Sequence, residues 1–270
     1  MVKLSSVEHP PPSPSIGAGE KVRIGFFSFT EVTDPGAHGA YNAWHQLDHL
    51  PEQLPVPGIA WGQRWVSTPA CRLARAVDGD RLAPIHYVTL YLMTEPVTET
   101  LRAFAALAEE LHRQDRFFEA RRSHLSGPFD VVATAAAGRV RVSAAAVPYR
   151  PGTGVYVLVE QYCGDEPEDA ETWRRPSEQQ ALVAVDGVAG VWSFAARADG
   201  VGRWRPGRHR ITVCYLDGDP LEVAEAVWPV LESGRDDAMT TVFAGPFETI
   251  TPWHWDWFEE QAAPAPSGSG

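Results

Sequence analysis

The chain has 270 residues, 44% of them hydrophobic, which is enough for one large domain or two of ordinary size. Its formal net charge of -12 argues against a nucleic-acid partner, because binding a phosphate backbone requires a basic surface. Three scattered cysteines supply no disulfide framework, and no apolar run reaches the roughly 20 residues of a membrane span. We therefore expect a soluble, cytoplasmic protein with neither nucleic acid nor membrane as its partner.

Both ends of the chain are rich in proline, serine and glycine. Residues 1–20 contain no apolar segment of signal-peptide length, and residues 259–270 end in AAPAPSGSG. Such compositions bury too little apolar surface to offset the entropy lost on ordering. We expect two disordered tails.

Between the tails, four segments recur in the same order, which indicates a tandem duplication. The pairs are VRIGFFSF at 22–29 with VYVLVEQY at 155–162, PGIAWGQRW at 57–65 with DGVAGVWSF at 186–194, YVTLYLM at 87–93 with RITVCYL at 210–216, and GPFDVVA at 127–133 with GPFETIT at 245–251. The second pair also places Trp44 opposite Trp173. We expect a first repeat over residues 21–135, a linker over 136–152 and a second repeat over 153–258.

Each repeat has the order strand, helix, strand, strand, helix, strand, which is the ferredoxin-like pattern. The helix predicted after residue 96 carries its apolar side chains on one stripe, formed by Leu101, Phe104, Leu107 and Leu111. In the strand at 87–93, aliphatic residues alternate with tyrosines, so the two kinds point to opposite faces. We expect the aliphatic face to pack against the helices and the tyrosine face to be covered by the other repeat's sheet.

A local motif lies at 41–65, YNAWHQLDHLPEQLPVPGIAWGQRW. It contains an aromatic-rich helix ending in His-Leu-Pro-Glu, a Pro-Gly turn, and a strand with an arginine near its end. The residues in these places are His49, Leu50, Pro51, Glu52, Pro57, Gly58 and Arg64. In this motif the chain resembles the EthD-like group of the dimeric α/β-barrel superfamily.

The resemblance implies a fold usually built from two chains, here fused into one. The expected fold class is α+β, with two tandem ferredoxin-like repeats whose antiparallel sheets pack as a pseudo-dimeric α/β barrel. Pairing of two fused chains into a homodimer stays open. The superfamily includes cofactor-free monooxygenases, isomerases, polyketide cyclases, dehydratases and haem proteins, so the fold does not select a reaction.

The second repeat loses the motif. Its alignment replaces His45 with Arg174, Asp48 with Ser177, His49 with Glu178 and Glu52 with Ala181. We therefore predict one working site, in residues 20–135, and a second repeat that mainly closes the barrel.

His45 and His49 are four residues apart and share one helix face, although Pro51 is expected to end the helix near His49. Imidazole titrates near neutrality, so the two histidines are the candidate catalytic residues, with His49 as the proton carrier. A structural use of His49 at a helix C-terminus is the alternative. Asp48 and Glu52 are expected to be surface or helix-terminal groups.

The sequence HQLDH has the shape of the inverted zinc-protease motif, but with Asp in place of Glu and Pro51 only two residues later. No third ligand is evident, and no histidine has the surroundings of a haem ligand. Nucleotide-binding motifs are absent, so we expect neither metal nor cofactor. His86 and His112 are isolated in the sequence, and PWHWDWF at 252–258 is expected to pack as a lid or a clasp between the repeats.

These residues predict a cofactor-independent enzyme of small-molecule metabolism, a lyase, dehydratase, cyclase or isomerase acting on an aromatic or polyketide-like carbonyl compound. Aromatic walls and groups that stabilise an enolate or phenolate would come from Tyr41, Trp44, Trp61, Arg64, Tyr87 and Tyr91. The alternatives are a cofactor-free monooxygenase and a non-catalytic protein that holds a hydrophobic metabolite for an oxygenase.

Overall fold

The computed structural model describes residues 21–79, 81–164, 175–197, 209–234 and 237–258. The predicted tails, Trp173 and Arg174 lie outside this part. The first unit contains β1 (Val22–Val32), η1 (Pro35–Ala37), α1 (His38–Trp44), η2 (His45–His49), α2 (Leu50–Gln53), β2 (Ile59–Val66), α3 (Pro69–Leu73), β3 (Val77–Asp78), β4 (Tyr87–Thr94), α4 (Val97–Arg113) and β5 (Arg121–Ala136). After η3 (Ala144–Tyr149), the second unit contains β6 (Gly154–Tyr162), α5 (Pro176–Val183), β7 (Val188–Ala196), β8 (His209–Leu216), α6 (Pro220–Ser233) and β9 (Met239–Thr249).

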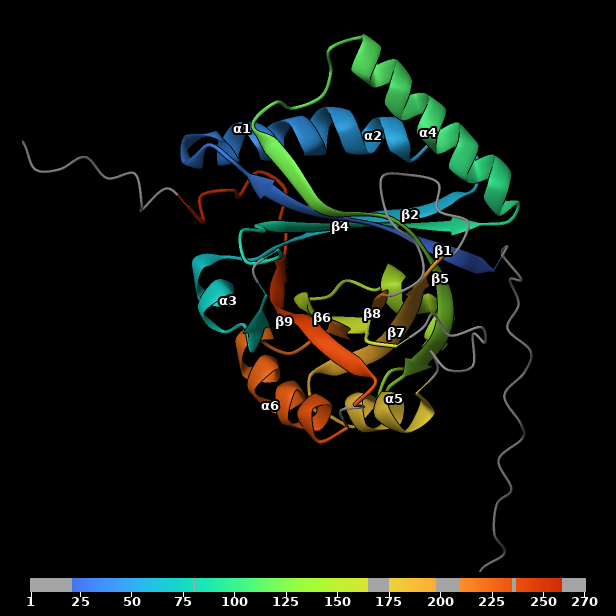
Figure 1. Ribbon diagram of the computed structural model, residues 1–270, viewed down its shortest axis with the longest axis vertical. Helices are drawn as coiled ribbons and strands as arrows, with labels where there is room; N and C mark the ends of the chain where they lie inside the picture. The colour runs from blue at the N-terminus through green and yellow to red at the C-terminus, as the bar shows by residue number, and fades with distance from the viewer. Residues whose placement is uncertain (1–20, 80, 165–174, 198–208, 235–236, 259–270) are drawn as a thin grey trace, which may run out of the picture.

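The strands form one closed antiparallel sheet. Their order is β2-β4-β1-β5-β7-β8-β6-β9-β3, and β2 also pairs with β9. The last strand of each unit therefore pairs with the second strand of the other, β5 with β7 and β9 with β2. In Figure 1, α1, α2 and α4 cover one side of the barrel, and α5 and α6 cover the opposite side. The predicted pair of ferredoxin-like repeats forming a pseudo-dimeric barrel is confirmed.

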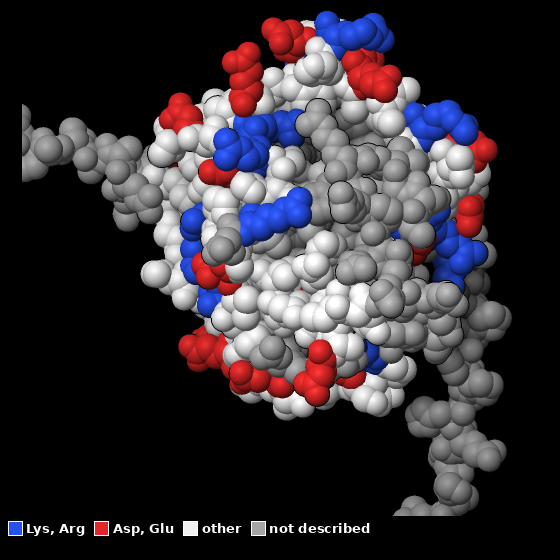
Figure 2. Space-filling model, viewed as in Figure 1, with Lys and Arg blue, Asp and Glu red and all other residues white. Residues whose placement is uncertain are grey.

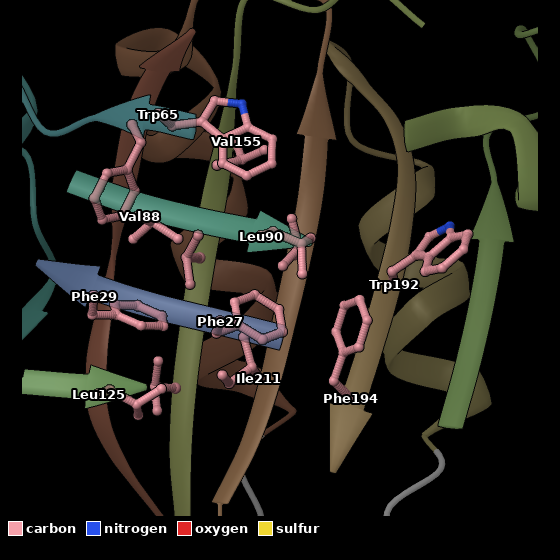
Figure 3. Packing of buried hydrophobic residues seen from close by; sticks show 14 of the residues in the cluster. Phe27, Phe29, Trp65, Val88, Leu90, Leu125, Val155, Trp192, Phe194 and Ile211 are labelled. Carbon is pink, nitrogen blue, oxygen red and sulfur yellow. The ribbon is translucent and has the colours of Figure 1, made fainter. Parts of the chain in front are cut away.

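Side chains from both units fill the barrel interior. Figure 3 shows Phe27, Phe29 and Trp65 on the first unit's strands facing Val155 and Phe194 of the second. The rings of Phe27 and Phe194 meet edge to face with centroids 5.0 Å apart. Burying each such side chain contributes about 1.5–3 kcal/mol, so this shared core holds the two units together.

The two faces of β4 point in the directions opposite to those expected. Val88 and Leu90 belong to the barrel core, whereas Tyr87 and Tyr91 pack on the helix side. For Tyr87 the physical reason is hydrogen bonding, because its hydroxyl has polar partners on the helix side. On the helix side, the Tyr87 hydroxyl lies 2.9 Å from both a histidine and an asparagine of α1.

The expectation that Pro51 ends the helix near His49 is also wrong. The helix runs from His38 to Gln53 and accommodates the proline through a wide π-type turn over His45–His49, in which the Leu50 N–H donates to the His45 carbonyl. Proline has no N–H, so it fits where the ladder of backbone bonds is already shifted. The two histidines therefore lie inside a helix.

The strand pairing largely supports the register of the repeats. Gly58 and Gly187 both turn the chain into the second strand of their units with positive φ, 87° and 82°. The first segment pair is wrong by three residues, however, because Phe27 pairs with Gly127 as Val157 pairs with Gly245. Apolar strand segments resemble one another at several offsets, so sequence similarity alone does not determine their register.

None of the helices in the described ranges combines the length and the apolar content that a transmembrane span requires. Charge is unevenly distributed on the face in Figure 2, where acidic side chains gather over α6 at the bottom and basic side chains lie along the side that carries α3.

The seam between β5 and β7 is expected to be sensitive to a single added methyl group. A Cβ at Gly190 would lie 2.7 Å from the Ala135 carbonyl oxygen and 2.8 Å from Val147. Gly190→Ala should lower the free energy of unfolding in urea by about 1–3 kcal/mol. Gly39→Ala is the control, because nothing lies within 4 Å of its added Cβ in α1, and it should raise stability by about 0.5–1 kcal/mol. Equal stability of the Gly190→Ala variant and the wild type would contradict the tight seam.

Candidate active site

The candidate site lies in a layer between the helix at residues 38–53 and the outer face of the sheet, which we call the helix layer. His45 and His49 face the same side, with ring centroids 5.2 Å apart. His49 stacks on Trp44 at 4.6 Å, and Tyr41 contacts both His45 and Tyr87. The π-type turn stacks the two histidines, and tertiary packing provides their aromatic surroundings.

Arg64 projects from β2 into this layer and is only 4% exposed. Its guanidinium lies 5.8 Å from the centre of the Tyr41 ring, and neither Nη1 nor Nη2 has a hydrogen-bond partner among the described residues. Burial lowers the pKa of Arg64, while the nearby phenols of Tyr41, Tyr87 and Tyr91 act in the opposite direction. A buried cation without a carboxylate is costly. The site is therefore suited to receive negative charge.

The two histidines are neutral at pH 7. Burial lowers the pKa of His49 to about 4, with Arg121 and Arg64 adding to the shift. Burial and the Arg64 charge hold the pKa of His45 well below its ordinary range. Nδ1 of each ring is buried and has no hydrogen-bond partner in the described part of the chain. The Nδ1 atom of each ring therefore keeps an unused hydrogen-bonding position.

Arg121, at the start of β5, is a site residue that the sequence did not predict. Its guanidinium lies 4.8 Å from the centre of the Phe117 ring and 5.4 Å from that of Trp44, in cation–π geometry. It is also the largest charge that depresses the pKa of His49. The sequence feature that could have indicated Arg121 is the aromatic pair Phe117 and Phe118, just before a strand that begins with two arginines.

Other predicted residues lie at different depths. Tyr91 is buried against Phe104, and its hydroxyl has no partner in the described chain. Asp48 and Glu52 accept hydrogen bonds from Arg116 at 2.8 Å on the outer side of the helix, as expected for surface groups. Trp61 does not join the histidines, because it is 39% exposed and lies beside Tyr149.

In the corresponding layer of the second unit, the buried arginine is paired with carboxylates. Arg210, which occupies in β8 the place of Tyr87 in β4, is fully buried. It donates to Glu160 at 2.8 Å and to both oxygens of Glu178 at 2.8 and 2.9 Å. Glu178 stands where the alignment places His49 in the first unit. The second unit therefore satisfies its own buried charges, whereas the first does not.

A cavity of about 540 Å³ lies at the end of the helix layer, where α3 and the last described segment meet the first unit. His38, His86, Arg72 and Arg75 line it, and Phe258 stacks on His38 at 4.0 Å. The segment at 252–258 thus runs from the second unit onto the first, in the manner of a clasp. The sequence left His86 isolated and did not single out His38, because the cavity forms only through long-range contacts. Nowhere in the described ranges do three potential metal ligands converge.

No protein-family model matches the chain, and no curated protein matches its sequence. Solved structures with a similar arrangement include an anthrone oxidase-like protein, 10% identical with a TM-score of 0.44 over 86% of this chain and 93% of that one. An encapsulated DyP-type peroxidase from Mycobacterium smegmatis is 12% identical, with a TM-score of 0.46 over 93% and 98%. A mutant chlorite dismutase from Candidatus Nitrospira defluvii is 12% identical, with a TM-score of 0.41 over 91% and 98%. At these identities and scores the likenesses carry no inference about activity.

Removing the buried charge should have opposite effects in the two units. Arg64→Met takes away an unpaired buried cation and should raise the free energy of unfolding by about 1–4 kcal/mol. Arg210→Met is the matched variant, and it should lower stability by about 3–5 kcal/mol because Glu160 and Glu178 lose their main partner. Urea unfolding at pH 7 measures both. A loss of stability in Arg64→Met would show that Arg64 is a structural cation.

Acid should destabilise the protein through its buried neutral histidines. The pKa of His86 is lowered to about 3 and that of His38 to about 4, both from 6.5, chiefly by burial. Between these pKa values and 6.5, the two imidazoles are protonated in the unfolded chain but not in the folded chain. The free energy of unfolding is therefore retained above about pH 6.5 and falls as the pH drops towards 4. His86→Asn keeps an acceptor for the Val32 N–H but does not titrate, so its stability should fall by about 1–2 kcal/mol less between pH 7 and pH 5. His112→Asn, at an exposed position, should lose as much stability between pH 7 and pH 5 as the wild type. If His86→Asn also loses as much as the wild type, His86 is not a source of the acid sensitivity.

Proposed function

We propose that the chain is an enzyme of small-molecule metabolism that moves a proton next to a carbonyl group of an aromatic or polyketide-like compound. The observation that carries the proposal is the unpaired Arg64 guanidinium, which shares one buried layer with the neutral imidazoles of His45 and His49. A neutral imidazole can accept a proton, and a buried cation can stabilise the resulting oxyanion. The reaction would be an elimination, cyclisation or isomerisation.

The chemical step assigns one role to each group. A ring nitrogen of His49 takes the proton from the carbon beside the carbonyl, and the C–H electron pair moves to form an enolate. The enolate oxygen accepts hydrogen bonds from Nη1 and Nη2 of Arg64, which have no partners in the described structure. Returning the proton from His49 to another carbon gives an isomer. In a dehydration, the enolate electron pair forms a C=C bond as the C–O bond of the neighbouring carbon breaks, and the proton held by His49 converts the leaving hydroxyl into water.

The low pKa of His49 fits this role once an anion is present. Arg121 and Arg64 contribute to the depression in the empty site, and a bound enolate or phenolate would neutralise part of their charge. The pKa of His49 would then rise towards neutrality, where proton transfer is efficient. The site becomes a better base when it holds the anion.

The resemblance to the EthD-like group supports the same region of the chain. His49, Pro51 and Glu52 lie in the helix, and Arg64 lies on the following strand beneath it. Membership of that group remains part of the proposal, and it rests on these residues alone.

Solvent exchange tests the proposal without knowledge of the natural substrate. A panel of hydroxylated aromatic ketones and short polyketide-like β-diketones is incubated with the protein in D₂O, and NMR follows deuterium entering beside the carbonyl. The wild type should accelerate exchange of at least one compound, and His49→Gln and Arg64→Gln should each slow it by about 100-fold or more. His112→Gln is the control, since this exposed histidine contacts the same Phe117 as His49. If deuterium exchange persists in His49→Gln, or if no compound of the panel exchanges, the proposed proton transfer by His49 is wrong. Oxygen uptake with one of these compounds would instead indicate a monooxygenase.

A further inference from the structure

The cavity beside α3 has walls of two kinds. Apolar surface comes from Val32 and Phe258, and from Leu73 at the rim, which is 90% exposed. Polar surface comes from two histidines and two arginines. Its volume of about 540 Å³ lies within the range of about 300–1,000 Å³ typical of small-molecule sites.

The hydrogen bonds of His86 fix which of its ring nitrogens carries the proton. Nδ1 accepts the backbone N–H of Val32 at 3.1 Å. In a neutral imidazole one nitrogen accepts and the other donates, and burial keeps this ring neutral by lowering its pKa to about 3. Nε2 of His86 is therefore a donor.

A chain of hydrogen bonds gives the same result for His38. Asn42 Nδ2 donates to the His38 carbonyl oxygen, which identifies it as the amide nitrogen, and it also donates to the Tyr87 hydroxyl at 2.9 Å. Among the described residues, the single hydroxyl hydrogen of Tyr87 finds an acceptor only if it points to His38 Nδ1, 2.9 Å away, and we infer this arrangement. Nδ1 accepts it, so Nε2 of His38 is also a donor.

The two arginines bring more positive charge to the cavity than Asp78, the one acidic residue of its described lining, can offset. Arg72 and Arg75 both donate to the carbonyl oxygens of Ala83 and Ile85, with Arg75 at 2.8 and 2.7 Å and Arg72 at 3.4 and 3.1 Å. Within the described part of the chain, neither arginine has a carboxylate oxygen within 4.0 Å, although Asp78 in the lining acts on both electrostatically. Burial and the neighbouring Arg72 lower the pKa of Arg75 to about 10.

We propose that this cavity binds a small aromatic carboxylate, with the carboxylate held by Nε2–H of His38 and His86 beside the Arg72 and Arg75 guanidiniums, and the ring against Phe258. Apart from the carboxylate of Asp78, the polar side chains of the described cavity wall are donors. A ligand carboxylate is a pure acceptor that also offsets their positive charge. Phe258 and the rim of Leu73 supply the apolar surface that a flat ring needs.

This site is separate from the proposed active site. Its polar groups come from α1, α3 and the start of β4, whereas His45, His49 and Arg64 lie farther along the helix layer. Tyr87 joins the two, because its hydroxyl bonds His38 and its ring lies 4.8 Å from that of Tyr41. Binding of the carboxylate does not require the proton-transfer function to be correct.

The first arm of the test uses the wild-type protein alone. Long-range ¹H–¹⁵N NMR of the imidazoles at pH 7 reports the tautomer of each ring. His38 and His86 should both carry the proton on Nε2. A proton on Nδ1 of either ring overturns the proposal.

The second arm measures binding of 2-naphthoate by calorimetry, with 2-naphthamide as the neutral comparison. Naphthoate should bind one molecule per chain and shift the His38 and His86 signals, and the amide should bind at least tenfold more weakly. Arg72→Gln should weaken naphthoate binding at least tenfold, with urea unfolding confirming a folded variant, and Arg102→Gln on the exposed side of α4 should not change it. Equal binding of acid and amide, no binding of naphthoate at millimolar concentration, or unchanged binding in folded Arg72→Gln would each overturn the proposal.

Discussion

The unpaired charge of Arg64 is the constraint on which the functional half of this protein depends. Moving a guanidinium out of water costs several kcal/mol, and in most proteins a carboxylate compensates for that cost. In the described structure, Arg64 has phenols and neutral imidazoles around it instead. Burial in this layer, more than any single charge, keeps His45 and His49 unprotonated, and the charge of Arg64 adds to that effect at both rings, after Arg121 at His49.

The stability of the barrel core offsets the energetic cost of this buried charge. Aromatic and aliphatic side chains of both units share one core, and each unit's last strand pairs with the other's second strand. Stability therefore comes from a region that contains none of the candidate site residues. The helix layers outside the barrel are then free to diverge. In the second unit, Arg210 forms ion pairs with Glu160 and Glu178. In the first unit, Arg64 occupies the place that Ser193 has in the second, and no carboxylate among the described residues pairs with it.

Much of this architecture could be predicted from the sequence, and the failures have physical causes. Repeated segments and the helical spacing of His45 and His49 are local patterns, so they predicted the duplication and the histidine pair. The direction of the β4 faces depended on which layer could bond the Tyr87 hydroxyl, and alternation alone does not contain that information. The helix passes Pro51 because the wide turn before it absorbs the missing bond. Arg121 and the cavity depend on contacts between distant segments.

Tyr87 connects the two polar groups of the first unit and limits how independent they can be. Its single hydroxyl hydrogen is committed to His38, and its oxygen accepts from Asn42, so the phenol is fixed in orientation. The ring of Tyr87 contacts Tyr41, which lies beneath the Arg64 guanidinium. Burial keeps the phenol of Tyr87 protonated by raising its pKa. Tyr87 therefore links the two polar groups through packing and a hydrogen bond, and its own charge does not change.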